Sequence, residues 1–189
     1  MDVHNLEYYI NQILELSPEE LGLLTACVVS RQLKKGELIL KEGAICRHFY
    51  LVQKGHLRTW YNKDGVSINL NFTFEGSFSS NLKSLKNREA STFNIEAGED
   101  SDVWVFPLDN ISRQLNLYPQ ISRFIRRLAI QILIDSEEYS NLFKIHTPAE
   151  RYYYMEQNNP RLLQRIPLSQ IASYLGVARE TLSRIRARK

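Results

Sequence analysis

The spacing of apolar residues changes twice along the 189-residue chain, and each change predicts a different kind of element. Near the N-terminus the spacing is helical, with apolar residues at Leu6, Ile10, Ile13 and Leu14. A second helix is predicted to begin at Ser17, where Pro18 suits the first turn and Glu20 stands in the capping-box position. Residues 4–26 are therefore expected to be helical.

Between Cys27 and Phe106 the pattern becomes that of strands. Short β-rich runs end in glycine turns, and Lys63-Asp64-Gly65 is a strong hairpin signal. The run from Val66 to Phe74 alternates and predicts a half-buried strand, with one apolar face made of Ile68, Leu70, Phe72 and Phe74. Many short strands spaced by roughly 8–12 residues predict an antiparallel barrel or sandwich, so the fold class is α+β.

A long helix is expected from Pro119 to about Ile145. Its stripe steps alternately by four and three residues, as in a heptad seam, through Ile121, Ile125, Leu128, Ile132, Asp135, Tyr139 and Leu142. Two interpretations fit: the helix covers its own barrel, or it also forms a parallel dimer seam. The length of the seam favours the second. We therefore expect a homodimer whose interface contains Ile121, Ile125, Leu128, Ile132 and Tyr139.

The chain is expected to divide into three parts. Thr147-Pro148-Ala149-Glu150 has the features of a helix start with a capping box, which places a boundary near His146. The expected parts are a strand-rich domain with N-terminal helices (1–118), a dimerisation helix (119–146) and a helix-turn-helix domain (147–189). The run Arg161 to Ile166 is expected to supply a strand before the helix-turn-helix, and no wing strand is expected after it.

The segment from Ile166 to Lys189 meets several requirements of a helix-turn-helix at once. Ala172 is the small residue needed where the two helices cross, and Gly176 follows in the turn, where φ is positive. The apolar residues that close the pair inward are Ile171, Leu175, Val177, Leu182 and Ile185. An ordinary helical hairpin with a basic face would not need all of these, so the segment predicts binding to double-stranded DNA.

The outward face of the second helix carries the chemistry for reading bases. Arginine suits the O6 and N7 atoms of guanine, and glutamate can accept from N4 of cytosine. Other arginines and Lys189 could meet phosphates. The predicted DNA-binding residues are Arg179, Glu180, Ser183, Arg184, Arg186 and Arg188, with Ala187 on the same face.

Charge is distributed unevenly along the chain, although its formal net value is only +3. Residues 147–189 hold eight basic and three acidic residues, whereas residues 1–146 hold sixteen basic and eighteen acidic. A basic tail on a mildly acidic body is typical of nucleic-acid binding, although a solvated basic surface would look the same.

Several other classes find no support in the sequence. No nucleophile–base pair, metal-ligand spacing or P-loop is present, so an enzyme is not expected. Cys27 and Cys46 are too few for a disulfide framework and are expected to be free thiols. No apolar run approaches the roughly 20 residues that span a bilayer, and the first residues lack a signal peptide. We expect a cytoplasmic protein without a membrane contact.

These features together resemble the Crp/Fnr family, the cyclic-AMP receptor protein type of bacterial transcription regulator. The resemblance covers nearly the whole chain and implies a β-roll, a long dimer helix and a winged helix-turn-helix. The family's recognition-helix arginines and glutamate match Arg179, Glu180 and Arg184, which the resemblance implies read base edges. The family's turn glycines resemble Gly36, Gly43, Gly55, Gly65 and Gly76. Implied partners are a near-palindromic DNA site, a second copy of the chain and RNA polymerase.

The chain departs from this family where cyclic AMP would bind. Members that bind it have Gly-Glu after the central strand and a later Arg-Ser pair whose arginine neutralises the phosphate. Here Gly76 is followed by Ser77, and alignment on Ala97 puts Ser91-Thr92 at the Arg-Ser position. A buried phosphate without its cation is costly, so cyclic AMP is not expected to bind. Arg88, three residues early, would rescue binding only through a gap in the alignment.

Other sensor chemistries of the family can also be weighed. An iron–sulfur cluster needs about four cysteine ligands, and the histidines have no context that marks a haem ligand, so no cofactor or metal is expected. The β-roll could bind another small molecule at Phe72, Phe74, Gly76, Ser77, Phe78, Ser91 and Thr92, or the aromatic residues could simply fill a core. The alternative function is a small-molecule-binding module, for a cyclic nucleotide or another ligand, with a weak or vestigial DNA-binding tail.

Overall fold

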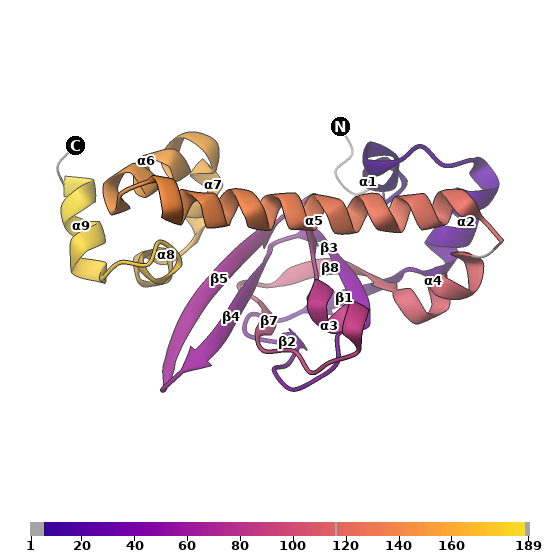
Figure 1. Ribbon diagram of the computed structural model, residues 1–189, viewed down its shortest axis with the longest axis horizontal. Coiled ribbons are helices and arrows are strands. Elements are labelled where there is room, and N and C mark those ends of the chain that lie inside the picture. The colour runs from indigo at the N-terminus through magenta and orange to yellow at the C-terminus, as the bar shows by residue number, and fades with distance from the viewer. Residues whose placement is uncertain (1–5, 116, 188–189) are drawn as a thin grey trace.

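The computed structural model describes residues 6–115 and 117–187 (Figure 1). The strands are β1 (Val29–Leu33), β2 (Leu38–Leu40), β3 (His48–Lys54), β4 (His56–Lys63), β5 (Val66–Phe74), β6 (Phe78–Ser79), β7 (Asn94–Ala97) and β8 (Ser101–Pro107). The helices are α1 (Leu6–Ile13), α2 (Pro18–Cys27), α3 (Leu82–Asn87), α4 (Leu108–Leu115), α5 (Pro119–Ile145), α6 (Pro148–Asn158), α7 (Pro160–Arg165), α8 (Leu168–Tyr174) and α9 (Arg179–Ala187). Helix α5 runs along the molecule, with α1, α2 and α4 at one end and α6 to α9 at the other (Figure 1).

The strands form a β-roll, as the sequence predicted. In the described part of the chain they make two antiparallel sheets, in the orders β1-β8-β3-β6 and β2-β7-β4-β5. The turns between them use the expected glycines, which all have φ between +82° and +86°. At Gly55 a side chain is excluded both by the positive φ and by a close contact, because a Cβ would lie 2.3 Å from Ser101 Oγ.

The main core lies between the β-roll, the N-terminal helices and the first half of α5. Ile10, Leu24, Phe49, Phe106 and Phe124 are its large members, each at most 1% exposed. Helix α2 begins as predicted, because Ser17 accepts from the backbone N–H of Glu20 and the Glu20 carboxylate accepts from the N–H of Ser17.

The long helix has the predicted bounds, and two residues of its predicted dimer seam are buried within their own chain. Ile121 and Leu128 are 0% exposed because they pack into the β-roll of their own chain. The large apolar side chains that α5 leaves exposed are Ile130, Leu133 and Ile134 in its middle, at 47%, 57% and 43%, and Ile145 at its end, at 71%. Heptad spacing marks one buried stripe on a helix without saying which partner buries it.

Helices α6 to α9 form a C-terminal unit with a core of its own. Leu162, Ile171, Leu175 and Leu182 are buried there. Thr147 and Glu150 make the predicted capping box at the start of α6. The predicted strand at Arg161 to Ile166 is wrong, because Pro160 opens helix α7. The structure places no strand among residues 119–187, so in that part of the chain no strand lies beside the helix-turn-helix.

Candidate DNA-binding helix and sensor cavity

Helices α8 and α9 form the predicted helix-turn-helix. Ala172 is 2% exposed where the two helices meet, and the N–H of Val177 donates to its carbonyl across 2.9 Å. Gly176 has a φ of +68°, and a Cβ there would lie 3.1 Å from the Phe143 ring. Leu182 is 0% exposed and closes α9 against α8. The turn therefore fixes the angle at which α9 leaves the unit.

The predicted base-reading residues lie on the exposed face of α9. Arg179, Glu180, Ser183, Arg184 and Arg186 are all exposed. The guanidinium of Arg184 lies 3.5 Å from Thr181 Oγ1. Within the described residues no carboxylate pairs with an arginine of α9, so these cations are available to a ligand. Arg188 lies outside the described residues.

Two side chains fasten the helix-turn-helix to the end of α5. The Tyr139 hydroxyl donates to the carbonyl of Tyr174 across 2.5 Å, and the two rings stack at 4.6 Å. Arg151 on α6 donates to the carbonyl of Leu175 across 2.9 Å and to that of His146 across 3.1 Å. Burial raises the pKa of the Tyr139 hydroxyl, so it stays a donor at every ordinary pH. Tyr139 thus contacts its own chain rather than a partner at this atom.

The C-terminal unit also docks on the outer face of β5. The N–H of Asn69 donates to Ser173 Oγ across 3.1 Å, and its side-chain amide donates to the carbonyl of Gln170. Phe72 packs edge-on against Tyr174, with ring centres 5.4 Å apart. Both acceptors to which Asn69 donates belong to α8, while its side-chain oxygen accepts from Arg58 on β4, so this strand holds the first helix of the helix-turn-helix.

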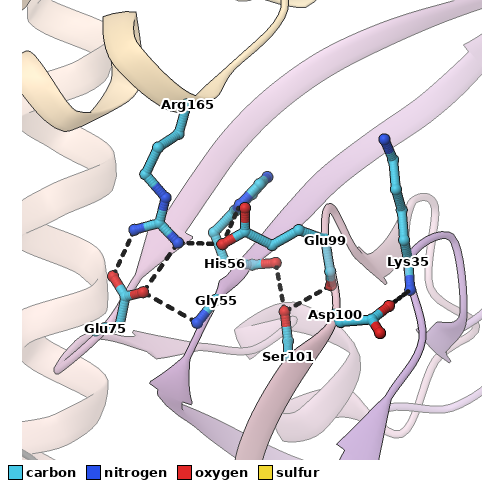
Figure 2. Close-up of polar contacts among 8 residues, drawn as sticks. All are labelled: Lys35, Gly55, His56, Glu75, Glu99, Asp100, Ser101 and Arg165. Atoms are coloured by element: carbon cyan, nitrogen blue, oxygen red, sulfur yellow. Dashed lines mark hydrogen bonds and ion pairs between the residues drawn. The ribbon is translucent and has the colours of Figure 1, made fainter.

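A charged cluster completes the docking surface (Figure 2). Arg165, at the end of α7, makes two hydrogen bonds of 2.8 and 2.9 Å to the Glu75 carboxylate and a third to Glu99. The N–H of Gly55 donates to Glu75 across 2.9 Å. His56 lies beside Glu99 and is 3% exposed. Two turns of the β-roll therefore share one cation from the C-terminal unit.

The interior of the β-roll opens toward α5 as a cavity of about 460 Å³. Its polar lining is mainly hydroxyls and one amide, and its apolar lining is mostly aromatic, with Leu70 and Ile132 as its aliphatic members. Asp135 is the one charged side chain among the described residues that line it. The lining includes Thr59, Asn71, Phe78, Ser80, Phe93, Asp135, Ser136 and Tyr139. A carboxylate without a facing cation favours a neutral or cationic ligand over a phosphate.

The structure brings only some of the predicted effector residues together. Phe72 and Phe74 belong to the core of the C-terminal unit, as the core-filling alternative expected. Phe78 lines the β-roll cavity, whereas Gly76 has a φ of +82° in the β5–β6 turn. With Ser77, Phe72, Phe74 and Phe78 also line a separate cleft of about 470 Å³ between β5, α5 and α6. Neither of these two spaces is lined by Ser91 or the exposed Thr92.

The reason is an irregularity in β5 that alternation could not reveal. Thr59 pairs with Asn71 and Trp60 pairs with Asn69, so Leu70 is an extra residue in the ladder. Leu70 and Asn71 consequently line the β-roll cavity, while Phe72 turns to the C-terminal unit. The predicted single apolar face of this strand is therefore divided between the β-roll cavity and the core of the C-terminal unit.

The position expected to hold a phosphate-binding arginine is occupied by a closed polar pair. Ser91 is 2% exposed; its hydroxyl donates to the Phe93 carbonyl across 2.6 Å and accepts from Asn81 Nδ2 across 2.9 Å. Asn81, which the sequence reasoning did not single out, also caps α3. Arg88 does not rescue the site, because its guanidinium pairs with Asp109.

The described residues offer little to a metal. No group of three or more His, Cys, Asp or Glu side chains there could hold an ion. Cys27 and Cys46 are free thiols. No helix in the described ranges has both the length and the apolar character needed to cross a membrane.

Comparison with known proteins gives the same organisation. Residues 30–118 match the family model of the cyclic nucleotide-binding domain. The transcriptional activator protein FnrA of Stutzerimonas stutzeri is 26% identical across 91% of this chain and 75% of its own length. The transcriptional activator protein anr of Pseudomonas aeruginosa is 27% identical across 91% of this chain and 75% of its own length.

Solved structures share the fold. A transcriptional regulator of the crp/fnr family from Eubacterium rectale has a TM-score of 0.72 at 20% identity, covering 96% of this chain and 87% of its own. FixK2 from Bradyrhizobium japonicum also has a TM-score of 0.72, at 21% identity, covering 85% of this chain and 83% of its own.

A β-roll of the cyclic nucleotide-binding type, joined by a long helix to a helix-turn-helix, defines the class of two-unit sensor-regulators. The match of residues 30–118 to the family model, the similarity to FnrA and anr, and the fold shared with the solved structures all place the chain within that class. These comparisons support a regulator of the Crp/Fnr type, since the chain is similar to FnrA, to anr and to a solved regulator of the crp/fnr family.

Proposed function

We propose that this chain is a DNA-binding transcription regulator, in which α9 enters the major groove and reads base edges. The observation that carries the proposal is the exposed row of arginines on α9, which pair with no carboxylate of the described residues and are held at a fixed angle by the Gly176 turn. The relatives FnrA and anr are transcriptional activators, which supports regulation rather than catalysis. The protein would act in the cytoplasm, where DNA and RNA polymerase are its partners.

Binding assays at several salt concentrations test the base-reading role. Arg184→Ala should relax sequence preference at one base pair, by about 1–3 kcal/mol, because a bidentate contact is lost. Arg186→Ala should weaken all DNA sequences alike and reduce the salt slope by about one. Arg126→Ala removes an exposed cation of α5 and should change neither. Equal sequence preference in the wild type and Arg184→Ala would overturn the base-reading assignment.

We also propose that the active form is a homodimer on a near-palindromic site, with half-sites about one helical turn apart. The proposed contact is the open stripe of Ile130, Leu133 and Ile134, in place of the buried residues Ile121 and Leu128. Leu133→Asp should give monomers by analytical ultracentrifugation. Lys144→Asp, on an exposed position of the same helix, should leave the dimer intact. A Leu133→Asp protein that stays dimeric would place the interface elsewhere.

The sensor unit is proposed to respond to a ligand other than cyclic AMP, bound in the β-roll cavity. Asp135 and the closed Asn81–Ser91 pair support this, because neither can neutralise a cyclic phosphate. Thermal unfolding with cyclic nucleotides and with neutral or cationic metabolites is the test. We expect no stabilisation by cyclic AMP, and a clear shift at micromolar cyclic AMP would contradict the proposal.

The alternative is a small-molecule-binding module whose C-terminal unit no longer binds DNA. The exposed arginines of α9 favour the regulator over this module, since a vestigial helix has no need of a row of unpaired cations. A wild-type protein that binds ligand but shows no salt-dependent DNA binding would favour the module.

A further inference from the structure

The contact between the C-terminal unit and the β-roll contains one cation that both turns depend on. Arg165 spans Glu75 on the β5–β6 turn and Glu99 on the β7–β8 turn, and its guanidinium also lies 5.1 Å from the Phe74 ring centre (Figure 2). Its side chain is 26% exposed, so solvent screens the cluster only in part. Removing Arg165 would leave two partly buried carboxylates close together without a counter-charge.

His56 is the buried member of the cluster. Its Nδ1 atom lies 3.5 Å from Glu99 Oε1 and has no hydrogen-bond partner among the described residues. Its Nε2 atom is pressed against Gly98, where a Cβ would come within 1.9 Å. The ring cannot swing away on that side, so a proton added at Nδ1 would point to the carboxylate that Arg165 holds.

The charged groups that face His56 come from three elements. They are Glu99 and Glu75 on the two turns and Arg165 on α7. Neither β5 nor α8, which lie beyond its ring, contains a charged residue. The neighbouring Arg58 on β4 pairs with Glu96 on β7 at 2.9 Å and also donates to the side-chain oxygen of Asn69. No other charge in the described surroundings therefore competes for a proton on this ring.

The titration of these groups favours undocking in acid. Burial lowers the pKa of His56 below its ordinary value, and Glu99 offsets this only in part. When the unit leaves, water reaches the ring and Arg165 withdraws, so the pKa rises again toward about 6.5. The undocked form then binds more protons, and a fall in pH below about 6.5 shifts the equilibrium toward it.

Glu75 acts in the same direction at lower pH. Burial alone would raise the pKa of its carboxyl group, but hydrogen bonds from Arg165 and Gly55 and the charge of Arg165 outweigh burial and lower it. Undocking removes Arg165 and restores a higher value. Protonation of Glu75 therefore also accompanies release, in the range near its ordinary pKa of about 4.3.

We infer that Arg165, Glu75, Glu99 and His56 form an acid-released latch, which docks the C-terminal unit on the β-roll at neutral pH and frees it when His56 is protonated. The exposed face of α9 stays open in the docked state, so docking is compatible with DNA contact. On the proposed function, the latch orients the two recognition helices of a dimer for paired half-sites. Acid should then weaken binding to a two-half-site DNA more than to a single half-site.

The test measures docking in the absence of DNA, so its outcome does not depend on whether the proposed function is correct. The Asn69 N–H, which donates to Ser173 Oγ, exchanges with solvent when the unit undocks. Its exchange in the full chain is measured by NMR at pH 7.5 and 5.5, corrected for intrinsic rates. We expect protection to fall at least tenfold in the wild type at pH 5.5. In the Arg165→Met variant, the Asn69 N–H should be unprotected at both pH values.

Two further variants separate the latch from a general effect of acid. His56→Gln removes the titrating group and should keep Asn69 protected at pH 5.5. Asp100→Asn is the matched control, because Asp100 neighbours Glu99 but pairs with Lys34 at the surface; it should behave as the wild type. If Arg165→Met does not fold, Glu99→Gln takes its place, with partial loss of protection expected at pH 7.5.

Several results would overturn the latch. Wild-type protection that is equal at both pH values excludes acid release, and acid release that persists in His56→Gln excludes that residue as its cause. Full Asn69 protection at pH 7.5 in Arg165→Met, or in Glu99→Gln where that variant replaces it, shows that the charged cluster does not hold the unit.

Discussion

The β-roll carries two contact surfaces that differ in chemistry. Against the first half of α5 it presents apolar side chains, and Ile121, Phe124 and Leu128 of that helix are all 0% exposed. Against the C-terminal unit it presents the carboxylates that bind Arg165, and Asn69, which donates hydrogen bonds to α8. Its apolar contacts there are few beyond Phe72 and Phe74.

This difference distinguishes the contact with α5, which stabilises the fold, from the contact with the C-terminal unit, which fixes how that unit lies on the β-roll. Apolar burial is non-directional and is lost only when water enters, so the α5 contact should open only on unfolding. Hydrogen bonds and ion pairs are directional, and each contributes little net free energy, because water replaces them when they break. The second contact can therefore open while the first stays closed.

The largest expected effect comes from the apolar surface. Phe124→Ala should lower the free energy of unfolding by about 3–5 kcal/mol, because it leaves a cavity in the packed core. The Phe124 ring is fully buried and lies 6.3 Å from that of Phe106. Urea denaturation at fixed protein concentration measures the change. Arg123→Ala, the exposed neighbour on the same helix, should stay within about 0.5 kcal/mol of the wild type. A similar small change for Phe124→Ala would mean that the two surfaces do not differ.

A smaller effect is expected at the joint between α5 and the helix-turn-helix. Tyr139→Phe removes the hydroxyl that donates to the Tyr174 carbonyl and leaves that acceptor without this bond. The cost should be about 1–2 kcal/mol, and it should fall on docking rather than on the β-roll core. Faster exchange of the Asn69 N–H with unchanged exchange in β3 and β8 is the expected pattern. Tyr154→Phe, at a side chain 37% exposed, is the control.

Features set by neighbouring residues were predictable from the sequence. The capping boxes at Ser17 and Thr147 form as predicted, because the bonds join residues three apart. The five turn glycines and Gly176 all have positive φ, because only glycine adopts it without strain. The exposed face of α9 also follows from spacing alone, since the buried Leu182 fixes which side faces outward.

Features set by distant contacts were not predictable in the same way. The stripe on α5 was predicted to cover the barrel and also to form a dimer seam, and spacing alone could not show that Ile121 and Leu128 meet the β-roll. The extra residue Leu70 divides β5 between the β-roll cavity and the core of the C-terminal unit, and alternation gives no sign of it. The Arg165 cluster joins residues 66 and 90 positions apart in the sequence, on turns whose approach depends on the whole fold. No local pattern carries that information.

The smallest expected effect lies within α9 and leaves both surfaces untouched. The carbonyl of Ala178 accepts the first bond of this helix, from the N–H of Leu182 across 3.1 Å, so Ala178 occupies the N-cap position without a capping side chain. Ala178→Ser supplies a hydroxyl that can accept from the next turn, and it should stabilise α9 by about 0.5–1 kcal/mol. Slower amide exchange in α9 and DNA binding tightened by about two- to fivefold are expected. Exchange at Asn69 should not change, because Ala178 is exposed and outside the docking surface. A variant that slows exchange at Asn69 as much as in α9 would show that the helix-turn-helix and the docking surface are one cooperative unit rather than two.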